Sequence, residues 1–157
     1  MHQNGWTNIC TGIFAMIENE VFLDTAFAVS LFIPNDQHHS LAVMLGNEIS
    51  ANRVRLVTTR AIVLEIGNYL SRQRHRMAAV KLMQSLGEDE NIKIIPMTED
   101  LYERGFDLFR SRPDKEWGII DCISFVVMWE LGIHSALTTD KHFQQAGFNA
   151  LLRKDMS

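Results

Sequence analysis

The sequence predicts an α/β fold, a three-layer α/β/α sandwich in which helices cover both faces of a mainly parallel sheet of four to five strands. Short, continuously apolar runs alternate along the chain with longer segments whose apolar residues recur at helical spacing. Runs that are apolar on both faces are typical of parallel strands, which helices bury from either side. The length of 157 residues and the 46% hydrophobic content suit one domain with a single core.

The elements can be assigned in chain order from these patterns. Strands are expected at 21–23, 54–59, 91–98 and 135–139, with a short fifth strand at 149–152. Helices are expected at 24–33, before Pro34, and at 41–53, 60–70, 77–87, 98–112 and 118–131. Thr58 or Thr59 can cap the helix after the second strand, and Gly132 closes the last helix.

Basic residues are concentrated in one segment of the chain. The net charge of −4 argues against general attraction to nucleic acid, and residues 1–52 contain no Lys or Arg. Residues 53–81 contain seven basic residues around a single acid, Glu65. Such a segment could steer a polyanion toward that glutamate, although a solvated helix face would give the same pattern. The candidate contacts to a polyanion are Arg60, Arg72, Arg74 and Arg76.

The sequence carries no signal for a membrane or for secretion. No apolar run reaches the roughly 18–20 residues that span a bilayer. The apolar stretch near the N-terminus lacks the preceding Lys or Arg of a signal peptide. Cys10 and Cys122 lie in apolar contexts and have neither disulfide nor metal-ligand spacing. We therefore expect a cytoplasmic protein with two buried thiols.

Four acidic residues stand at the edges of apolar segments. Asp24 directly follows the first strand, and Asp140 directly follows the fourth. Glu65 lies about two turns into the helix after the second strand, and Asp121 lies near the start of the helix before the fourth. Ligand sites of open α/β sheets form at the carboxyl ends of the strands, so these four acids can converge there.

Each acid also has a purely structural interpretation. Asp24 and Asp121 can satisfy free amides at helix starts, and Asp140 can form an Asx-turn. Glu65 is the hardest to explain in this way, because apolar residues flank it on both sides in sequence. Two carboxylates about 4 Å apart repel by roughly 4 kcal/mol at an effective dielectric near 20, so a cluster needs a cation. Hard oxygen donors without cysteine suit Mg²⁺ or Mn²⁺ better than Zn²⁺.

Several motifs together resemble the PIN-domain ribonucleases, and within them the VapC-type toxins of toxin–antitoxin systems. The resemblance covers residues 21–153 and rests on the stretches VFLDTAFAVSLF, LVTTRAIVLEIGNYL, DKEWGIIDCISFVVM and ALTTDKHFQQAGFNALL in this order. It implies a Mg²⁺- or Mn²⁺-dependent endoribonuclease whose acidic set corresponds to Asp24, Glu65, Asp121 and Asp140. It also implies an RNA substrate, a cognate antitoxin and a homodimer. A domain over residues 16–157 is then expected, with residues 1–15 as a disordered extension.

The resemblance suggests a role for each residue. Asp24 and Asp121 would bind the metal directly, Asp140 directly or through water, and Glu65 would bind a second ion or orient the attacking water. Thr25 and Thr139 would support these carboxylates by hydrogen bonding. Trp117 and Phe125 are expected in the core or at an interface, and His142 is expected to pack or cap beside Phe143 rather than to shuttle protons.

Two departures from the family pattern leave alternatives open. The family usually has Ser or Asn where this chain has Ala26, and Ser where it has Gly118. The loss of these polar groups favours a second interpretation, a catalytically weakened PIN-like domain that binds protein or RNA. A phosphatase of haloacid-dehalogenase type also begins with an Asp after a strand. That chemistry needs a second Asp at the position of Ala26, and no phosphate-binding loop is present.

Overall fold

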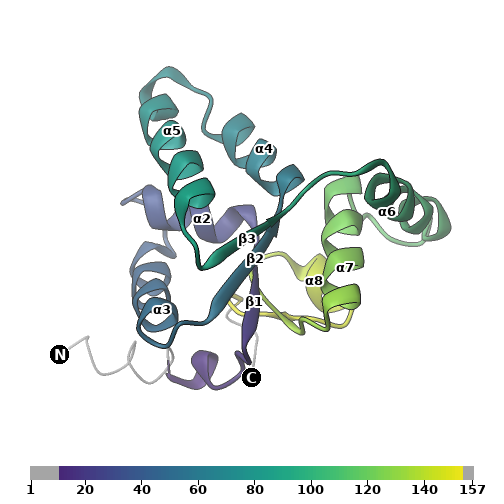
Figure 1. Ribbon diagram of the computed structural model, residues 1–157, viewed down its shortest axis with the longest axis horizontal. Helices are drawn as coiled ribbons and strands as arrows, with labels where there is room; N and C mark the ends of the chain where they lie inside the picture. The colour runs from purple at the N-terminus through teal and green to yellow at the C-terminus, as the bar shows by residue number, and fades with distance from the viewer. Residues whose placement is uncertain (1–10, 154–157) are drawn as a thin grey trace.

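The computed structural model describes residues 11–153, which form one five-stranded sheet with helices on both faces (Figure 1). All strand pairs are parallel, and the strand order is β3-β2-β1-β4-β5. The strands are β1 (Glu20–Leu23), β2 (Arg55–Thr59), β3 (Ile92–Ile95), β4 (Ser135–Leu137) and β5 (Asn149–Ala150). The predicted fold class is therefore confirmed, with five strands.

The helices form two groups, one on each side of the sheet (Figure 1). One group contains α2 (Thr25–Phe32), α3 (His39–Ala51), α4 (Arg60–Tyr69) and α5 (Gln73–Glu88). The other contains α6 (Glu99–Ser111), α7 (Ile119–Leu131) and the short α8 (Lys141–Gln145). Sequence analysis did not predict α8, and α5 begins at Gln73 rather than at 77. Part of the basic segment is therefore helical.

The core lies on both faces of the central strands. Val21, Phe22 and Leu23 of β1 are at most 2% exposed, as expected for a strand that helices cover on both sides. On the α7 side, the ring of Phe125 packs edge-on against Trp117 and Phe143, with centroid distances of 5.0 Å in each pair. Phe125 and Trp117 are therefore core residues.

Threonines at the end of β2 fix where α4 begins. The Thr59 side chain accepts a hydrogen bond from the backbone N–H of Ile62 at 3.2 Å, so Thr59 is the N-cap. The Thr58 hydroxyl instead donates to the Leu23 carbonyl at 2.8 Å and ties β2 to the end of β1. At the other end of the chain, Gly132 closes α7 in the left-handed conformation with φ of 67°.

The N-terminal boundary can be described in part. Residues 11–14 are helical, and Ile13 and Phe14 pack against the core. Residues 1–10, including Cys10, lie outside the described residues, and the extension over residues 1–15 stays a prediction. Cys122 is buried, and burial raises the pKa of its thiol to about 11. No helix of residues 11–153 is long and apolar enough to cross a membrane.

Candidate functional site

A cleft of about 480 Å³ opens at the carboxyl ends of β1 and β4, where the strand order changes direction. This is the place where open α/β sheets bind ligands. The four acids from sequence analysis all line it: Asp24, Glu65, Asp121 and Asp140. They come from four elements that are far apart in sequence, and the parallel topology brings them together.

Asp24 is the most deeply placed of these acids and is 9% exposed. Although it occupies the N-cap position of α2, its side chain makes no capping hydrogen bond. Instead, its Oδ2 accepts a hydrogen bond of 2.6 Å from the Thr138 hydroxyl. The pKa of Asp24 is raised to about 7, chiefly by burial and in smaller part by the charges of Glu65 and Asp121, while the hydrogen bond from Thr138 opposes the rise.

Glu65 is placed differently from what its apolar neighbours in sequence suggest. Its side chain is partly exposed, and the residue before it, Leu64, is 59% exposed to solvent. The Thr25 hydroxyl donates to Glu65 Oε2 at 2.7 Å and so joins α2 to α4 across the cleft. Thr25 thus contacts one member of the acidic set, and its supporting role in the site stays a prediction.

Asp121 and Asp140 both contact the same nitrogen of the His142 ring. His142 Nδ1 is 3.2 Å from Asp121 Oδ2 and 3.3 Å from Asp140 Oδ1. Both acids also have the structural roles considered above: Asp121 Oδ2 accepts from the Gly118 amide, and Asp140 Oδ1 accepts from the His142 amide. These hydrogen bonds engage one oxygen of each carboxylate. Burial, followed by the charge of Asp140, raises the pKa of Asp121.

Two carboxylates and an imidazole nitrogen form a donor set that can hold a divalent cation, and the carboxylates of the cleft are the ligands that Mg²⁺ and Mn²⁺ prefer. Asp121, Asp140 and His142 each offer a ligand atom, and these atoms lie within 4.8 Å of one another. No Lys or Arg lies among the residues that line the cleft. A buried carboxyl group with a raised pKa, surrounded by further acids, is the electrostatic setting that a bound cation relieves. The residues present therefore fit the expected Mg²⁺ or Mn²⁺.

Comparison with known proteins assigns the fold and the family. The PIN domain family matches residues 21–149, which is most of the chain. The chain belongs to the PIN-domain family. A 23S rRNA-specific endonuclease, VapC20 of Mycobacterium tuberculosis, is 30% identical over 129 residues, which cover 82% of this chain and 95% of VapC20. The crystal structure of M. tuberculosis VapC20, described as a sarcin–ricin loop cleaving toxin, matches with a TM-score of 0.72 at 25% identity. That match covers 83% of this chain and 97% of the VapC20 chain.

Of the two positions where this PIN domain departs from the family pattern, Ala26 lines the cleft and Gly118 contacts one of the cleft acids. Ala26 is one of the lining residues and places a methyl group there. Gly118 is the N-cap of α7 and has no side chain, but its backbone N–H donates to Asp121 Oδ2 at 3.0 Å. A backbone donor therefore supports Asp121 without a hydroxyl at position 118.

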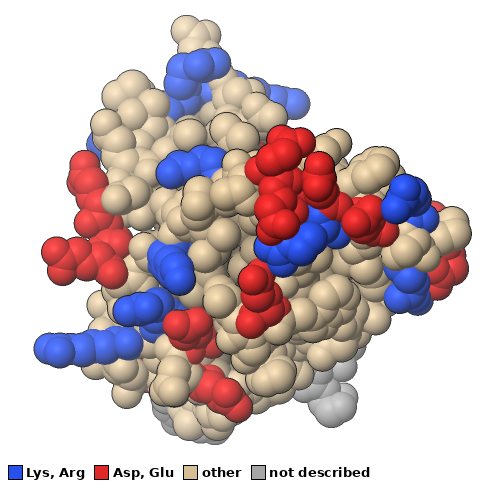
Figure 2. All heavy atoms as spheres, turned by 45° about the vertical axis from the view of Figure 1, so that its right-hand side comes forward, with Lys and Arg blue, Asp and Glu red and all other residues tan. Residues whose placement is uncertain are grey.

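The candidate arginines lie outside the cleft. Arg60 is exposed at the first turn of α4, and Arg72, Arg74 and Arg76 are exposed where α4 passes into α5. Figure 2 shows Lys and Arg side chains at the top of the molecule, the end at which α4 and α5 meet in Figure 1. Within residues 11–153, none of the four arginines forms an ion pair.

Several cleft residues were missed by sequence analysis. Thr138, rather than Thr139, holds Asp24, while Thr139 lines the cleft. Asp36 is a fifth acid in the lining, and its Oδ1 accepts from the Ser30 hydroxyl at 2.9 Å and from the His38 amide at 2.8 Å. It comes from the loop between α2 and α3, which carries no strand-end signal. Tyr69, at the end of α4, was assigned only to a helix face.

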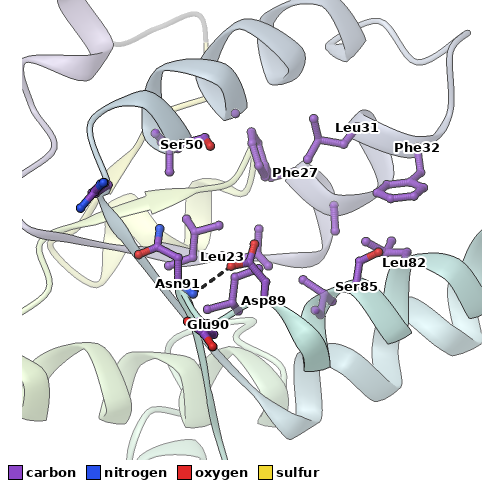
Figure 3. A pocket seen from close by; sticks show the side chains of 17 residues that line it. Leu23, Phe27, Leu31, Phe32, Ser50, Leu82, Ser85, Asp89, Glu90 and Asn91 are labelled. Atoms are coloured by element: carbon purple, nitrogen blue, oxygen red, sulfur yellow. Dashed lines mark hydrogen bonds between the residues drawn. The ribbon is translucent and has the colours of Figure 1, made fainter.

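The PIN domain has a second hollow, also of about 480 Å³, between α3 and α5 (Figure 3). Its lining is mainly apolar and includes Phe27, Leu31 and Phe32 of α2, with Leu82 of α5. Polar residues gather at one end, where the backbone N–H of Asn91 donates to Asp89 Oδ1 at 2.8 Å. Helices α3 and α5 thus face one another across an apolar cavity.

Proposed function

We propose that this PIN domain is a Mg²⁺- or Mn²⁺-dependent endoribonuclease and the toxin of a toxin–antitoxin pair. The convergence of Asp24, Glu65, Asp121 and Asp140 on one cleft carries the proposal. The similarity to VapC20 over 95% of that protein supports it and suggests the substrate class, a structured ribosomal RNA such as the sarcin–ricin loop. The protein would then act in the cytoplasm.

In the proposed reaction, water attacks the phosphorus in line, the bond to the 3′ oxygen breaks, and that oxygen takes up a proton. The products are a 3′-hydroxyl and a 5′-phosphate. Asp24, Asp121 and Asp140 would hold the ion, which would supply the positive charge that orients a phosphodiester and lowers the pKa of water. Glu65, fixed by Thr25, either binds a second ion or orients the water. Thr138 holds Asp24, and the Gly118 amide holds Asp121.

The proposed protein partners are a cognate antitoxin and a second copy of this chain. The apolar cavity between α3 and α5 offers a place for the apolar side chains of an antitoxin segment, since Ile49 and Leu86 line it from opposite helices. An acidic cleft would in addition accept a basic side chain from the same partner. An antitoxin segment that fills both the apolar cavity and the acidic cleft would inhibit cleavage.

Ala26 favours a second candidate function, a binding module with weakened catalysis. It lines the cleft where the family usually places a polar side chain. Without that side chain, one hydrogen bond to a carboxylate or a water molecule is lost. In this case the acids would still bind a cation, and RNA would be bound without being cut.

Cleavage of a synthetic sarcin–ricin-loop hairpin and of a mixed RNA pool by the purified chain tests these candidates. Mg²⁺ or Mn²⁺ should support cutting, EDTA should stop it, and Asp24→Ala should abolish it. Asp107→Ala, which removes an exposed acid of α6, is the matched control and should cut like the parent. Circular dichroism checks that both variants fold. An inert parent that still binds Mn²⁺ and RNA would reject the nuclease and support the binding module.

A further inference from the structure

Tyr69 is an exposed aromatic residue in a polar cleft. Its side chain is 66% exposed, and the residue lines the same cleft as the four acids. It lies four residues after Glu65 at the end of α4, so the two side chains project from the same side of the helix. Among the lining residues within the described chain, Tyr69 is the single Phe, Tyr or Trp.

The carboxylates alone do not offer a surface for a nucleobase. They hold the cation and, through it, a phosphate, while the base beside that phosphate needs an apolar face. An aromatic ring supplies such a face, because every base can stack on it. Tyr69 has this ring at the rim of the cleft, and the packing of the core does not account for it, since the side chain is mostly in solvent.

The charge distribution indicates a path for the RNA strand. Arg72, Arg74 and Arg76 follow Tyr69 in the chain and are exposed at the turn from α4 to α5. No carboxylate of residues 11–153 pairs with them. Arg76 is oriented by its hydrogen bond of 2.9 Å to the Ser71 carbonyl. Along this edge, the surface therefore changes from acidic to aromatic to basic.

We propose that Tyr69 stacks on the nucleobase next to the scissile phosphate, while the arginines after it bind the phosphates beyond. The inference rests on the proposed nuclease function and adds to it a residue that binds a base of the substrate. A base within a duplex is already stacked between its neighbours and is not available to the ring, so loops and single strands are selected. Base identity contributes little, because stacking tolerates every base.

The test compares Tyr69→Ala, Tyr69→Phe and Leu64→Ala. Leu64 is an exposed residue of the same helix outside the cleft and serves as the matched control. The substrate is the synthetic sarcin–ricin-loop hairpin, and the same sequence annealed to its complement serves as the duplex probe. Tyr69→Ala should lower kcat/KM by about tenfold or more, mainly through KM. Tyr69→Phe and Leu64→Ala should stay within about twofold of the parent, and the duplex should resist cleavage by all of them.

A second readout follows stacking without cleavage. In an Asp24→Asn background, hairpins that carry 2-aminopurine at each loop position in turn should show quenched fluorescence at one position beside the cut. Tyr69→Ala should remove this quenching. Equal kcat/KM for Tyr69→Ala and the parent would overturn the inference, as would a loss in Tyr69→Phe as large as that in Tyr69→Ala. A parent that neither binds nor cuts the hairpin or the RNA pool would instead overturn the proposed function together with this inference.

Discussion

The acidic cleft and the apolar cavity have the same volume, about 480 Å³, but opposite linings. The cleft lies at the ends of parallel strands and contains a buried carboxyl group, Asp24, whose ionisation is unfavourable. The cavity lies between helices α3 and α5 and is lined mainly by apolar side chains. A bound cation would stabilise the acidic cleft, and a bound apolar segment would stabilise the apolar cavity. The two hollows should therefore respond differently to pH, to metal and to substitution.

The largest expected difference is the response of the cleft to pH. The pKa of Asp24 is about 7 in the folded protein and 3.8 in the reference state, so the folded protein binds the extra proton between these values. The free energy of unfolding of the metal-free protein should therefore fall as pH rises from 4 to 7. Ionisation of Asp24 should remove on the order of 2–4 kcal/mol over this range. Urea unfolding at several pH values measures it.

Asp24→Asn is the matched variant for this effect, because it keeps the shape of the side chain without its charge. Without metal, the parent should lose stability as pH rises toward 8 and Asp24 ionises, whereas the variant should not. The difference in free energy of unfolding should therefore grow in favour of the variant. Mn²⁺ should then stabilise the parent but not the variant. Parallel pH profiles for the two proteins would show that ionisation of Asp24 is not unfavourable in the folded state.

Thr138→Val should have the next largest effect, on metal affinity. The Thr138 hydroxyl donates to the charged form of Asp24 at 2.6 Å, so its removal should raise the pKa of Asp24 still further. More of Asp24 is then protonated at pH 7, and a cation must displace that proton. Mn²⁺ binding at pH 7, measured by calorimetry, should weaken by about ten- to a hundredfold.

Thr138→Ser keeps the hydroxyl and should bind Mn²⁺ nearly as the parent does. The difference between Thr138→Val and the parent should shrink at pH 9, where Asp24 is ionised in both. A loss of affinity that is equal at pH 7 and pH 9 would mean that Thr138 positions Asp24 and does not act through its pKa.

The fold was predictable because its signals are local. Continuously apolar strands such as Val21–Leu23 and the cap at Thr59 show directly in sequence. Strand ends were less predictable: β3 stops at Ile95, before Pro96, although the apolar pattern continues to Met97. The short helix α8 was missed because its five residues are too few for a helical period.

The site was predictable only where its residues follow strands or resemble family motifs. Asp24 and Asp140 stand at strand ends, and their place at the cleft follows from the parallel topology. Asp36 reaches the cleft from a loop, which sequence patterns do not place. The choice between Thr138 and Thr139 depends on which way each side chain points in the segment that follows β4. Glu65 looked buried in sequence because a linear list of neighbours does not show which side of a helix faces solvent.

The smallest expected effect is at the apolar cavity, where a methyl group can be added. Gly46 lies in the middle of α3 and lines the cavity, and a Cβ there would meet Leu31 Cδ2 at an ordinary contact distance of 3.7 Å. Gly46→Ala should raise the free energy of unfolding by about 0.5–1 kcal/mol, because Ala favours the helix. Urea unfolding measures this gain, and RNA cleavage should not change.

The same substitution in α6, Gly105→Ala, should have the opposite effect on stability. A Cβ at Gly105 would lie 2.5 Å from Ile123 Cγ1, where α6 packs closely on α7. It should therefore destabilise the protein by about 1–3 kcal/mol. If Gly46→Ala were destabilising as well, the hollow between α3 and α5 would be too tightly closed in solution to admit a methyl group. An antitoxin side chain would then have no room there either, and the partner would have to bind elsewhere on the molecule.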